Sequence, residues 1–230
     1  ADLRQIVLVA DSTDRNDVIN GFPGADTLVG GLGNDRLIGD DGSDTYVFRR
    51  GDGRDSIEDN GYPDIDVLRI EGYLPEDILL QVGRFDRADL EIGFVGSDDA
   101  ISVANTLFGD LYDSISRIDI VPEAGGSVAT SWTLDDIRAR LVSQSASSDD
   151  DLIRGFSSVD TLAGGLGDDF LSGQDGSDTY VFRRGDGHDQ IHDQGYGDTD
   201  VLRIEGYAFD EVVFSAARFD RANLEIRFAG

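Results

Sequence analysis

Aspartates recur along this chain at intervals of nine residues, and a large apolar residue stands two positions after each of them. The series continues with two intervals of eleven residues, and its aspartates are Asp17, Asp26, Asp35, Asp44, Asp55 and Asp66. Their apolar partners are Ile19, Leu28, Leu37, Tyr46, Ile57 and Leu68. A short repeat of fixed period is typical of a solenoid, in which each repeat packs on its neighbours.

The whole pattern occurs twice, with a shift of 134 residues. The second series is Asp151, Asp160, Asp169, Asp178, Asp189 and Asp200. Residues 42–72 and 176–206 are identical at 25 of 31 positions. We therefore expect two modules. Module 1 would span 1–142, with repeats at about 12–70 and a flanking segment at 71–142. Module 2 would span 143–230, with repeats at about 146–204 and a shorter flank at 205–230. The missing methionine and the shorter second flank suggest a piece of a longer polypeptide.

Each nine-residue unit joins a glycine-rich turn to a short strand. Glycine adopts positive φ angles without a Cβ clash, so the first four positions can turn tightly. The last three positions place one apolar side chain inward between two polar ones. Two units then complete one coil, and we expect Ile19 to stack on Leu37 and Leu28 on Tyr46. The predicted fold is an all-β parallel β-solenoid.

The same stacking would bring the aspartates of alternate units together, for example Asp17 with Asp35 and Asp26 with Asp44. Carboxylates at that spacing repel, and turn carbonyls would face the same gap. Calcium accepts six to eight oxygen ligands in flexible geometry, whereas magnesium demands a near-octahedral shell. Zinc would need cysteine or a histidine cluster, and the chain has no cysteine and only two histidines. The spacing therefore predicts calcium sites.

Residues 30–38 read Gly-Gly-Leu-Gly-Asn-Asp-Arg-Leu-Ile, and 164–169 repeat the start of this pattern. The pattern resembles the haemolysin-type calcium-binding repeat of the RTX (repeats-in-toxin) family. The segments "DTYVFRRGDGRDSIEDNGYPDIDVLRIEG" and "WTLDDIRARL" resemble the sequences that follow such repeats. The resemblance implies two tandem calcium-binding parallel β-rolls, each with a small antiparallel capping patch, and about eight Ca²⁺ ions. It also implies metal ligands at the aspartates of both series and at turn positions. These turn residues are Gly30, Gly31, Leu32, Gly33, Gly39, Asp41, Gly42, Gly164, Gly165, Leu166, Gly167, Gly173, Asp175 and Gly176.

The flanking segments alternate apolar and polar residues as half-buried strands do. Residues 90–94 and 224–228 predict strands, with partners in 77–85 and 211–219. Residues 100–105 and 115–120 are expected to extend the same antiparallel patch, which would cover the open edge of the roll. One short helix is expected at 134–142, begun by a capping box of Thr133 and Asp136. The single tryptophan, Trp132, is expected in the core of this cap.

The amino-acid composition excludes some classes of partner. The formal net charge is −28 and every basic residue is arginine, so a nucleic-acid partner is excluded by the lack of any dense basic cluster. No apolar run reaches the length of a membrane span. Ten recurring arginines could line a groove for an acidic polysaccharide, but pairing with nearby carboxylates is the favoured interpretation. They are Arg49, Arg50, Arg69, Arg84, Arg87, Arg183, Arg184, Arg203, Arg218 and Arg221. His188 and His192 are expected on the surface.

Catalysis has little support, because the aspartates belong to a metal-binding repeat and no nucleophile stands beside a histidine in module 1. We expect a non-enzymatic, calcium-dependent folding module of a large secreted bacterial protein. It would be disordered without calcium, since charge repulsion and glycine entropy outweigh a small core. The resemblance implies export by type I secretion machinery and folding outside the cell. The alternative is a polysaccharide-binding or substrate-positioning module of an extracellular enzyme, similar to the repeat modules of alginate epimerases.

Overall fold

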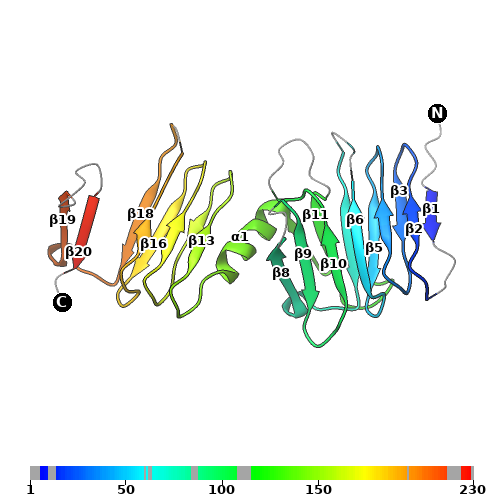
Figure 1. Cartoon of the computed structure of the whole chain (residues 1–230), viewed down its shortest axis with the longest axis horizontal. Helices are drawn as coiled ribbons and strands as arrows, with labels where there is room; N and C mark the ends of the chain where they lie inside the picture. Colours follow the sequence, from blue (N-terminus) through cyan, green and yellow to red (C-terminus); the bar gives the residue numbers. More distant parts are fainter. Residues whose placement is uncertain are drawn as a thin grey trace. The chain divides into compact units, whose positions relative to one another are not determined.

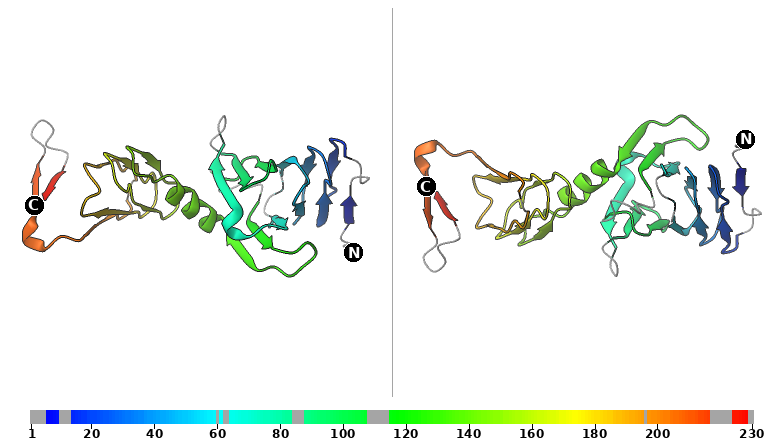
Figure 2. Two further views of the ribbon diagram at one scale, coloured as in Figure 1. Left: turned by 90° about the horizontal axis from the view of Figure 1, so that it is seen from below. Right: turned by 90° about the horizontal axis from the view of Figure 1, so that it is seen from above.

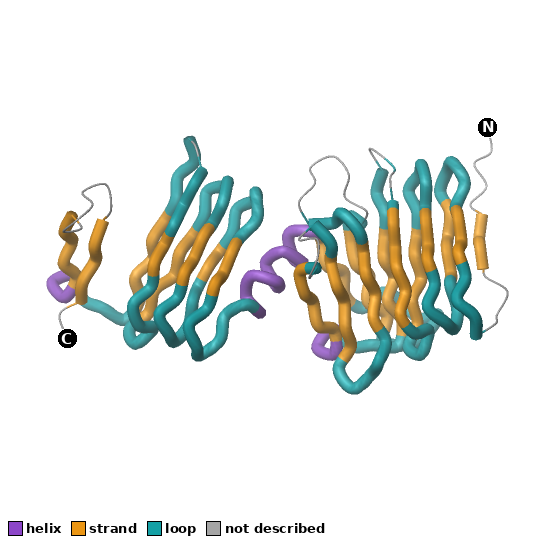
Figure 3. The backbone as a smooth tube through the Cα atoms, in the orientation of Figure 1, coloured by secondary structure: helices purple, strands orange, loops and turns teal. Residues whose placement is uncertain are grey.

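The computed structural model describes residues 6–9, 14–59, 61, 64–83, 88–107, 115–195, 197–216 and 224–228. It divides into two compact units, Ala1–Leu141 (unit 1) and Val142–Gly230 (unit 2). In each unit the chain passes alternately through two sheets, so that successive coils stack along the unit (Figure 1). Loops connect the strands at both ends of every coil (Figure 3). This architecture is the predicted β-solenoid of parallel strands.

Unit 1 contains two sheets of six strands each, which form the two faces of the roll (Figure 2). The first sheet has the order β1 (Ile6–Val9), β3 (Asp26–Val29), β5 (Thr45–Arg49), β7 (Val67–Glu71), β11 (Arg117–Val121), β12 (Thr130–Thr133). The second has the order β2 (Val18–Asn20), β4 (Arg36–Ile38), β6 (Arg54–Glu58), β10 (Ala100–Val103), β9 (Leu90–Phe94), β8 (Ile78–Val82). Sheet neighbours among β1 to β7 are parallel.

The strand registers confirm the predicted stacking of apolar residues. Ile19 pairs with Leu37 in one sheet, and Leu28 pairs with Tyr46 in the other. The two columns continue through Ile57 and Leu68. Leu28, Tyr46 and Leu68 have no exposed surface and Leu37 and Ile57 almost none. The alternation of one inward apolar residue with two outward polar ones therefore builds the core between the sheets.

The flank of unit 1 differs from its prediction in one respect. Strands β8 and β9 form the predicted antiparallel pair. However, β10 pairs with β9 on one side and in parallel with β6 on the other, while β11 pairs in parallel with β7 in the opposite sheet. The prediction that residues 100–105 extend the antiparallel patch is confirmed by the pairing of β10 with β9, whereas the prediction that residues 115–120 join the same patch is wrong, because β11 lies in the opposite sheet. Both segments add a further coil to the roll, because their apolar residues continue the two core columns, and only β12 closes β11 in the antiparallel sense.

Unit 2 repeats the start of this arrangement, although β14 and β17 are shorter than their counterparts β3 and β6. Its roll has one sheet of β13 (Leu152–Arg154), β15 (Phe170–Ser172), β17 (Gln190–Ile191) and another of β14 (Thr161–Leu162), β16 (Thr179–Arg183), β18 (Val201–Glu205). All pairings within these two sheets are parallel. A separate hairpin joins β19 (Val212–Ala216) to β20 (Leu224–Phe228), which confirms the strand predicted at 224–228. Short 3₁₀ turns at Pro75–Asp77 and Phe209–Glu211 precede β8 and β19.

One α-helix, α1 (Leu134–Gln144), lies within the described residues, two residues longer than predicted. It begins with the predicted capping box, since Thr133 N–H donates to Asp136 Oδ2 at 2.9 Å and Asp136 N–H donates to Thr133 Oγ1 at 3.3 Å. Trp132 is 3 % exposed, as predicted for a core residue, and Arg140 lies over its ring. No helix in the described part of the chain is both long and apolar enough to span a bilayer.

Candidate metal centre

The turns of the roll depend on left-handed backbone conformations that recur in both units. Gly31 and Gly33 have φ angles of 90° and 132°, and Gly165 and Gly167 have 101° and 130°. At the position of Gly31 in the next turn, Asp40 keeps a φ of 72° although it is not glycine. Left-handed conformations are strained for residues with a side chain, and such strain concentrates at functional sites. The turn geometry is thus maintained even where the glycine is lost.

The predicted aspartates form a ladder of hydrogen bonds across the coils. In every step, the Oδ1 atom of one aspartate accepts the backbone N–H of the aspartate one coil earlier, at 2.8–3.3 Å. In unit 1 the pairs are Asp17 with Asp35, Asp26 with Asp44, Asp35 with Asp55, and Asp44 with Asp66. In unit 2 they are Asp151 with Asp169, Asp160 with Asp178, Asp169 with Asp189, and Asp178 with Asp200. The structure therefore places the twelve predicted aspartates in the expected pairs.

The second carboxylate oxygen of each ladder aspartate, Oδ2, is the one available to bind a metal. In the middle of both ladders Oδ2 is buried and accepts no hydrogen bond from any described residue. These oxygens belong to Asp35, Asp44, Asp55, Asp169, Asp178 and Asp189. A buried ionised oxygen without a partner carries a large desolvation penalty, so such groups are nearly always paired or bound to a metal. The orphaned oxygens fit a cation at these positions.

Three aspartates near the start of the ladders, Asp26, Asp151 and Asp160, accept hydrogen bonds from the protein itself. Asp26 Oδ2 accepts the N–H of Phe22 at 2.7 Å, and Asp160 Oδ2 accepts the N–H of Phe156 at 2.6 Å. Asp151 Oδ2 accepts both the N–H and the hydroxyl of Ser147. The nine-residue repeats that contain these aspartates have residues other than glycine at several turn positions. Because their carboxylates already accept hydrogen bonds, a cation would stabilise them less than it would the carboxylates in the middle of the ladder.

The glycines at position one of the repeat leave room for the ladder carboxylates. A Cβ atom on Gly30 or Gly164 would overlap Oδ2 of Asp35 or Asp169, and one on Gly39 or Gly173 would overlap the next aspartate of the ladder. Leu32 and Leu166 are 54 % and 56 % exposed, and because a leucine side chain has no ligand atom, these residues could bind a metal only through their carbonyls. Asp41 and Asp175 likewise lie exposed on the turns. Gly42 and Gly176, the last of the predicted turn ligands, donate their N–H groups to Asp64 and Asp198.

Burial and mutual repulsion make the ladder carboxylates hard to ionise. Burial, reinforced by the neighbouring carboxylates, raises the pKa of Asp44, Asp55 and Asp66 to about 7. In unit 2 the same causes raise the pKa of Asp178 and Asp189 to about 6. A nearby cation would reverse this cost, because opposite charge favours the ionised carboxylate.

A cluster of three aspartates closes each ladder, and one member of each cluster was missed by the sequence analysis. In unit 1, oxygens of Asp44, Asp59 and Asp66 lie within 4.8 Å of one another, and the equivalents in unit 2 are Asp178, Asp193 and Asp200. Tyr46 donates its hydroxyl hydrogen to Asp59 Oδ2 at 2.5 Å, and Tyr180 does the same to Asp193. The available signal was the identity of Asp59 and Asp193 between the copies, where neighbouring residues differ.

The donor set consists only of oxygen atoms, which favours calcium over zinc. His188 is 94 % exposed and its ring lies 3.3 Å from Asp168, while His192 is also exposed and bonds to Gln194. The histidines are therefore surface residues, as predicted.

Several of the recurring arginines pair with carboxylates of their own unit. Glu71 accepts both Arg49 at 3.1 Å and Arg69 at 2.7 Å. Arg183 and Arg184 pair with Glu205 and Glu211, and Arg50 lies over the ring of Tyr73 with an ion pair to Asp77. Arg203 forms no ion pair with another described residue, and Arg84, Arg87, Arg218 and Arg221 lie outside the described residues. These contacts agree with the favoured interpretation of intramodular pairing.

Comparison with known protein families matches this chain to a calcium-binding repeat. The RTX calcium-binding nonapeptide repeat matches in four copies, at residues 11–46, 20–57, 145–171 and 154–191. The matched residues include the ladder from Asp17 to Asp55 and from Asp151 to Asp189, whereas Asp66 and Asp200 lie beyond them. A search of curated proteins gave no significant match to the chain.

Proposed function

The chain carries RTX calcium-binding nonapeptide repeats folded into β-rolls, and from this premise we propose that it is a calcium-dependent folding module of a larger secreted protein. The observation that carries the proposal is the set of buried Oδ2 atoms, in the middle of both ladders, that accept no hydrogen bond from any residue the structure describes. Bound calcium would supply the positive charge that these oxygens lack. The protein would then contribute a rigid frame in which the Oδ1 atoms hold adjacent coils together and the Oδ2 atoms bind the ion.

We propose that the remaining ligands are the carbonyls of the predicted turn residues, from Gly30 to Gly33 and at Gly39, Asp41 and Gly42, with their equivalents in unit 2. The pairing of aspartates leads us to propose about eight ions. The structure gives most support to the calcium sites at Asp35, Asp44 and Asp55 and at their counterparts in unit 2. Each of these aspartates has a buried Oδ2 atom that accepts no hydrogen bond from a described residue. Binding through oxygens of this kind is typical of calcium sites.

Without calcium, the proposed module is largely unfolded. A net charge of −28 opposes a compact state, and many turn positions are glycines that lose much conformational entropy on folding. The buried aspartates add to this cost because each must be ionised or protonated inside the roll. Calcium binding energy would then act as folding energy, as in other domains whose metal site forms only in the folded state.

Such coupling suits a protein that crosses a membrane unfolded. We propose that the chain stays unfolded in a cytosol poor in calcium, leaves through type I secretion machinery, and folds in the extracellular medium where calcium is abundant. The two modules, 1–142 and 143–230, are proposed to act as separate folding units. We propose no catalytic role, since the buried aspartates of the two ladders belong to the calcium-binding frame. Binding of acidic polysaccharide stays a prediction, and the arginine pairs weigh against it.

The test is far-UV circular dichroism of the chain in EDTA, followed by titration with calcium and, separately, with magnesium. We expect a largely disordered spectrum in EDTA and a cooperative change to a β spectrum with calcium alone. Isothermal titration calorimetry then gives the number of ions. A β spectrum that is already complete in EDTA and insensitive to calcium would contradict the proposal.

A further inference from the structure

The aspartate cluster of unit 1 extends beyond the residues that match the calcium-binding repeat. Asp44, Asp59 and Asp66 are 0 %, 4 % and 1 % exposed, and each has a carboxylate oxygen within 4.8 Å of the other two. The match to the RTX repeat ends at residue 57, so that Asp59 and Asp66 lie outside it. The repeat pattern alone therefore does not define this group of oxygens.

Asp59 stands where the preceding coils have glycine. Gly21, Gly39 and Asp59 each follow an aspartate of the ladder by four residues, in three successive coils. A glycine at this position contributes only backbone atoms, whereas Asp59 adds a carboxylate next to the pair of Asp44 and Asp66. In the described part of the chain, only this cluster and its counterpart in unit 2 bring three acidic side chains so close together.

Asp44 Oδ2 faces the other oxygens of the cluster. It is buried and accepts no hydrogen bond from any described residue. A Cβ atom on Gly39 would overlap Asp44 Oδ2, Asp59 Oδ2 and the hydroxyl of Tyr46 at once, so these three oxygens converge on one small space. A buried ionised oxygen without a partner is costly, and a cation in that space would remove the cost.

Two hydrogen bonds hold the Asp59 carboxylate in position. Oδ1 accepts the N–H of Gly61 at 2.7 Å, and Oδ2 accepts the hydroxyl hydrogen of Tyr46 at 2.5 Å. Each oxygen keeps a further lone pair for a metal. Carboxylates that bind metals are commonly oriented by hydrogen bonds of this kind. Tyr46 has no exposed surface, so that its hydroxyl is a fixed donor.

Unit 2 contains the same arrangement, which argues against a chance grouping of acidic residues. Oxygens of Asp178, Asp193 and Asp200 lie within 4.8 Å of one another. Asp178 Oδ2 is buried and accepts no hydrogen bond from a described residue. Tyr180 donates to Asp193 Oδ2 at 2.5 Å, and Gly195 N–H donates to Asp193 Oδ1 at 2.9 Å. Both copies thus orient the added carboxylate in the same way.

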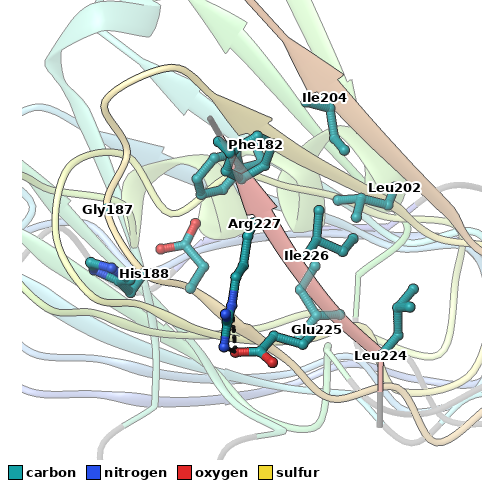
Figure 4. Close-up of a pocket in the computed structure, with 12 residues that line it drawn as sticks. Phe182, Gly187, His188, Leu202, Ile204, Leu224, Glu225, Ile226 and Arg227 are labelled. Atoms are coloured by element: carbon teal, nitrogen blue, oxygen red, sulfur yellow. Dashed lines mark hydrogen bonds and ion pairs between the residues drawn. The ribbon is translucent and has the colours of Figure 1, made fainter. Parts of the chain in front are cut away.

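The cavity of unit 2 that Figure 4 shows offers no comparable set of oxygens. Its volume is about 850 Å³, and apolar side chains such as Leu202 and Ile226 form much of its lining. Its acidic residues are Asp189 and Glu225, and Glu225 pairs with Arg227 at 2.8 Å. The cavity therefore has a single carboxylate without an arginine partner, whereas each cluster has three.

We propose that Asp44, Asp59 and Asp66 bind one calcium ion mainly through side-chain carboxylates, in a site that has a higher affinity than the other sites of its ladder and fills first. Calcium affinity depends on the charge of the ligands, and this site has one more carboxylate than an aspartate pair. It coincides with the site between Asp44 and Asp66, so it adds a ligand and not an ion to the proposed number.

The positions of the three residues explain why early filling would matter. Asp44 precedes β5, Asp59 follows β6 and Asp66 precedes β7, so one ion would link three consecutive strands. The end of the repeat region would then become ordered before the earlier coils, which could stack on it. Asp178, Asp193 and Asp200 occupy the same positions around β16, β17 and β18 in unit 2.

The experiment titrates the full chain with Tb³⁺, an oxygen-binding cation that occupies calcium sites and emits light when a neighbouring tyrosine absorbs the excitation. We expect the first equivalents, one for each cluster, to give most of the tyrosine-sensitised emission, because Tyr46 and Tyr180 contact the two clusters. Added calcium should displace the ion and remove the emission. Circular dichroism of the same samples shows how much of the chain is folded.

A variant of Asp59 tests the added ligand. Asp59→Asn keeps the shape of the side chain and removes its charge. It should remove the early emission that comes from unit 1 and weaken the first step of calcium binding, measured by calorimetry, by about tenfold. Asp98→Asn is the matched control, an exposed aspartate of the same unit, and should change neither quantity. The proposal is overturned if Asp59→Asn folds with calcium and leaves both quantities unchanged.

Tyr46→Phe gives a second readout, which does not depend on whether Asp59→Asn folds. It keeps the ring in the core and the three carboxylates, so the number of bound calcium ions should stay the same while the early emission from unit 1 is lost. Undiminished emission in this variant, or emission in the wild type that develops only after the other sites are filled, would overturn the proposal and leave calcium-dependent folding intact. A wild-type chain that does not fold with calcium would instead overturn the proposed function, on which this inference rests.

Discussion

Asp66 Oδ1 accepts the backbone N–H of Asp44 at 2.8 Å, while Asp44 Oδ2 lies buried with no hydrogen-bond partner among the described residues. One carboxylate oxygen of each such aspartate thus hydrogen-bonds to the neighbouring coil, and the other has no hydrogen-bond partner among the described residues. If the aspartates served only to turn the chain, burial of the second oxygen would be a pure cost. Its recurrence in three consecutive repeats of unit 1, and again in unit 2, is the strongest argument for a cation in the ladder.

The first prediction separates a structural aspartate from a metal ligand. Asp35→Asn keeps an oxygen that can accept the N–H of Asp17, and asparagine is as favourable in turns as aspartate. It removes the charge, on which calcium affinity depends strongly. We expect the calcium midpoint of folding, measured by circular dichroism, to rise about tenfold, which corresponds to ~1.4 kcal/mol. Glu123→Gln removes the same charge from an exposed site and should leave the midpoint nearly unchanged. An unchanged midpoint in Asp35→Asn would mean that its carboxylate binds no calcium.

The second prediction concerns the space around the ladder. Gly30→Ala places a methyl group where Asp35 Oδ2 lies, so the carboxylate must move. We expect a loss of about 1–3 kcal/mol in the free energy of unfolding with calcium present, as for other overpacked sites. Denaturant unfolding at saturating calcium measures this loss. Gly93→Ala is the matched control, because the nearest atom to its Cβ would be 4.0 Å away. Equal stability of the two variants would show that the carboxylate is free to move.

The pairing of aspartates in the ladder could be predicted because it follows from a short repeat of fixed period. The spacing of Asp17, Asp26 and Asp35 fixes which residues share a coil, and the alternation around Leu28 and Tyr46 fixes which side chains point inward. The flank was harder to predict, because residues 100–103 alternate in the same way whether they join a cap or a coil. Their parallel partner, β6, lies more than forty residues earlier in the chain.

The third member of the aspartate cluster could not be predicted from period alone. Asp59 does not occupy the aspartate position of a repeat, and it reaches Asp44 and Asp66 only because the coil returns there. Its hydrogen bond from Tyr46 depends on a side chain that the pattern assigns to the core.

The third prediction tests the start of α1. Thr133→Ala removes the hydroxyl that accepts Asp136 N–H, and with it a hydrogen bond that lowers the pKa of Asp136. Loss of such a cap costs about 0.5–2 kcal/mol. We expect a lower thermal midpoint for unit 1 by calorimetry and no change in the number of calcium ions bound. Thr133→Ser retains the hydroxyl and should restore the midpoint, whereas equal midpoints for Ala and Ser would rule out the cap as a source of stability.

The fourth prediction follows from the raised pKa values of Asp44, Asp55 and Asp66, which burial brings to about 7. Because these values lie above that of an aspartate in an unfolded chain, near 4, the calcium-free roll binds protons more tightly than the unfolded chain does. The contribution of these three aspartates to the stability of the calcium-free roll is therefore fully present below pH 4 and is lost as the pH rises from 4 to 7.

Calcium needs the ionised carboxylates and therefore competes with these protons. We expect the calcium midpoint of folding to rise as the pH falls from 8 to 6, and in EDTA we expect more β structure at pH 5 than at pH 8. Circular dichroism at constant ionic strength measures both effects. Calorimetry in buffers of different ionisation enthalpy should show protons released on calcium binding at pH 6.5 and few at pH 8.5. A calcium midpoint that is the same at pH 8 and pH 6, with no proton release, would show that the ladder aspartates are ionised before the metal binds.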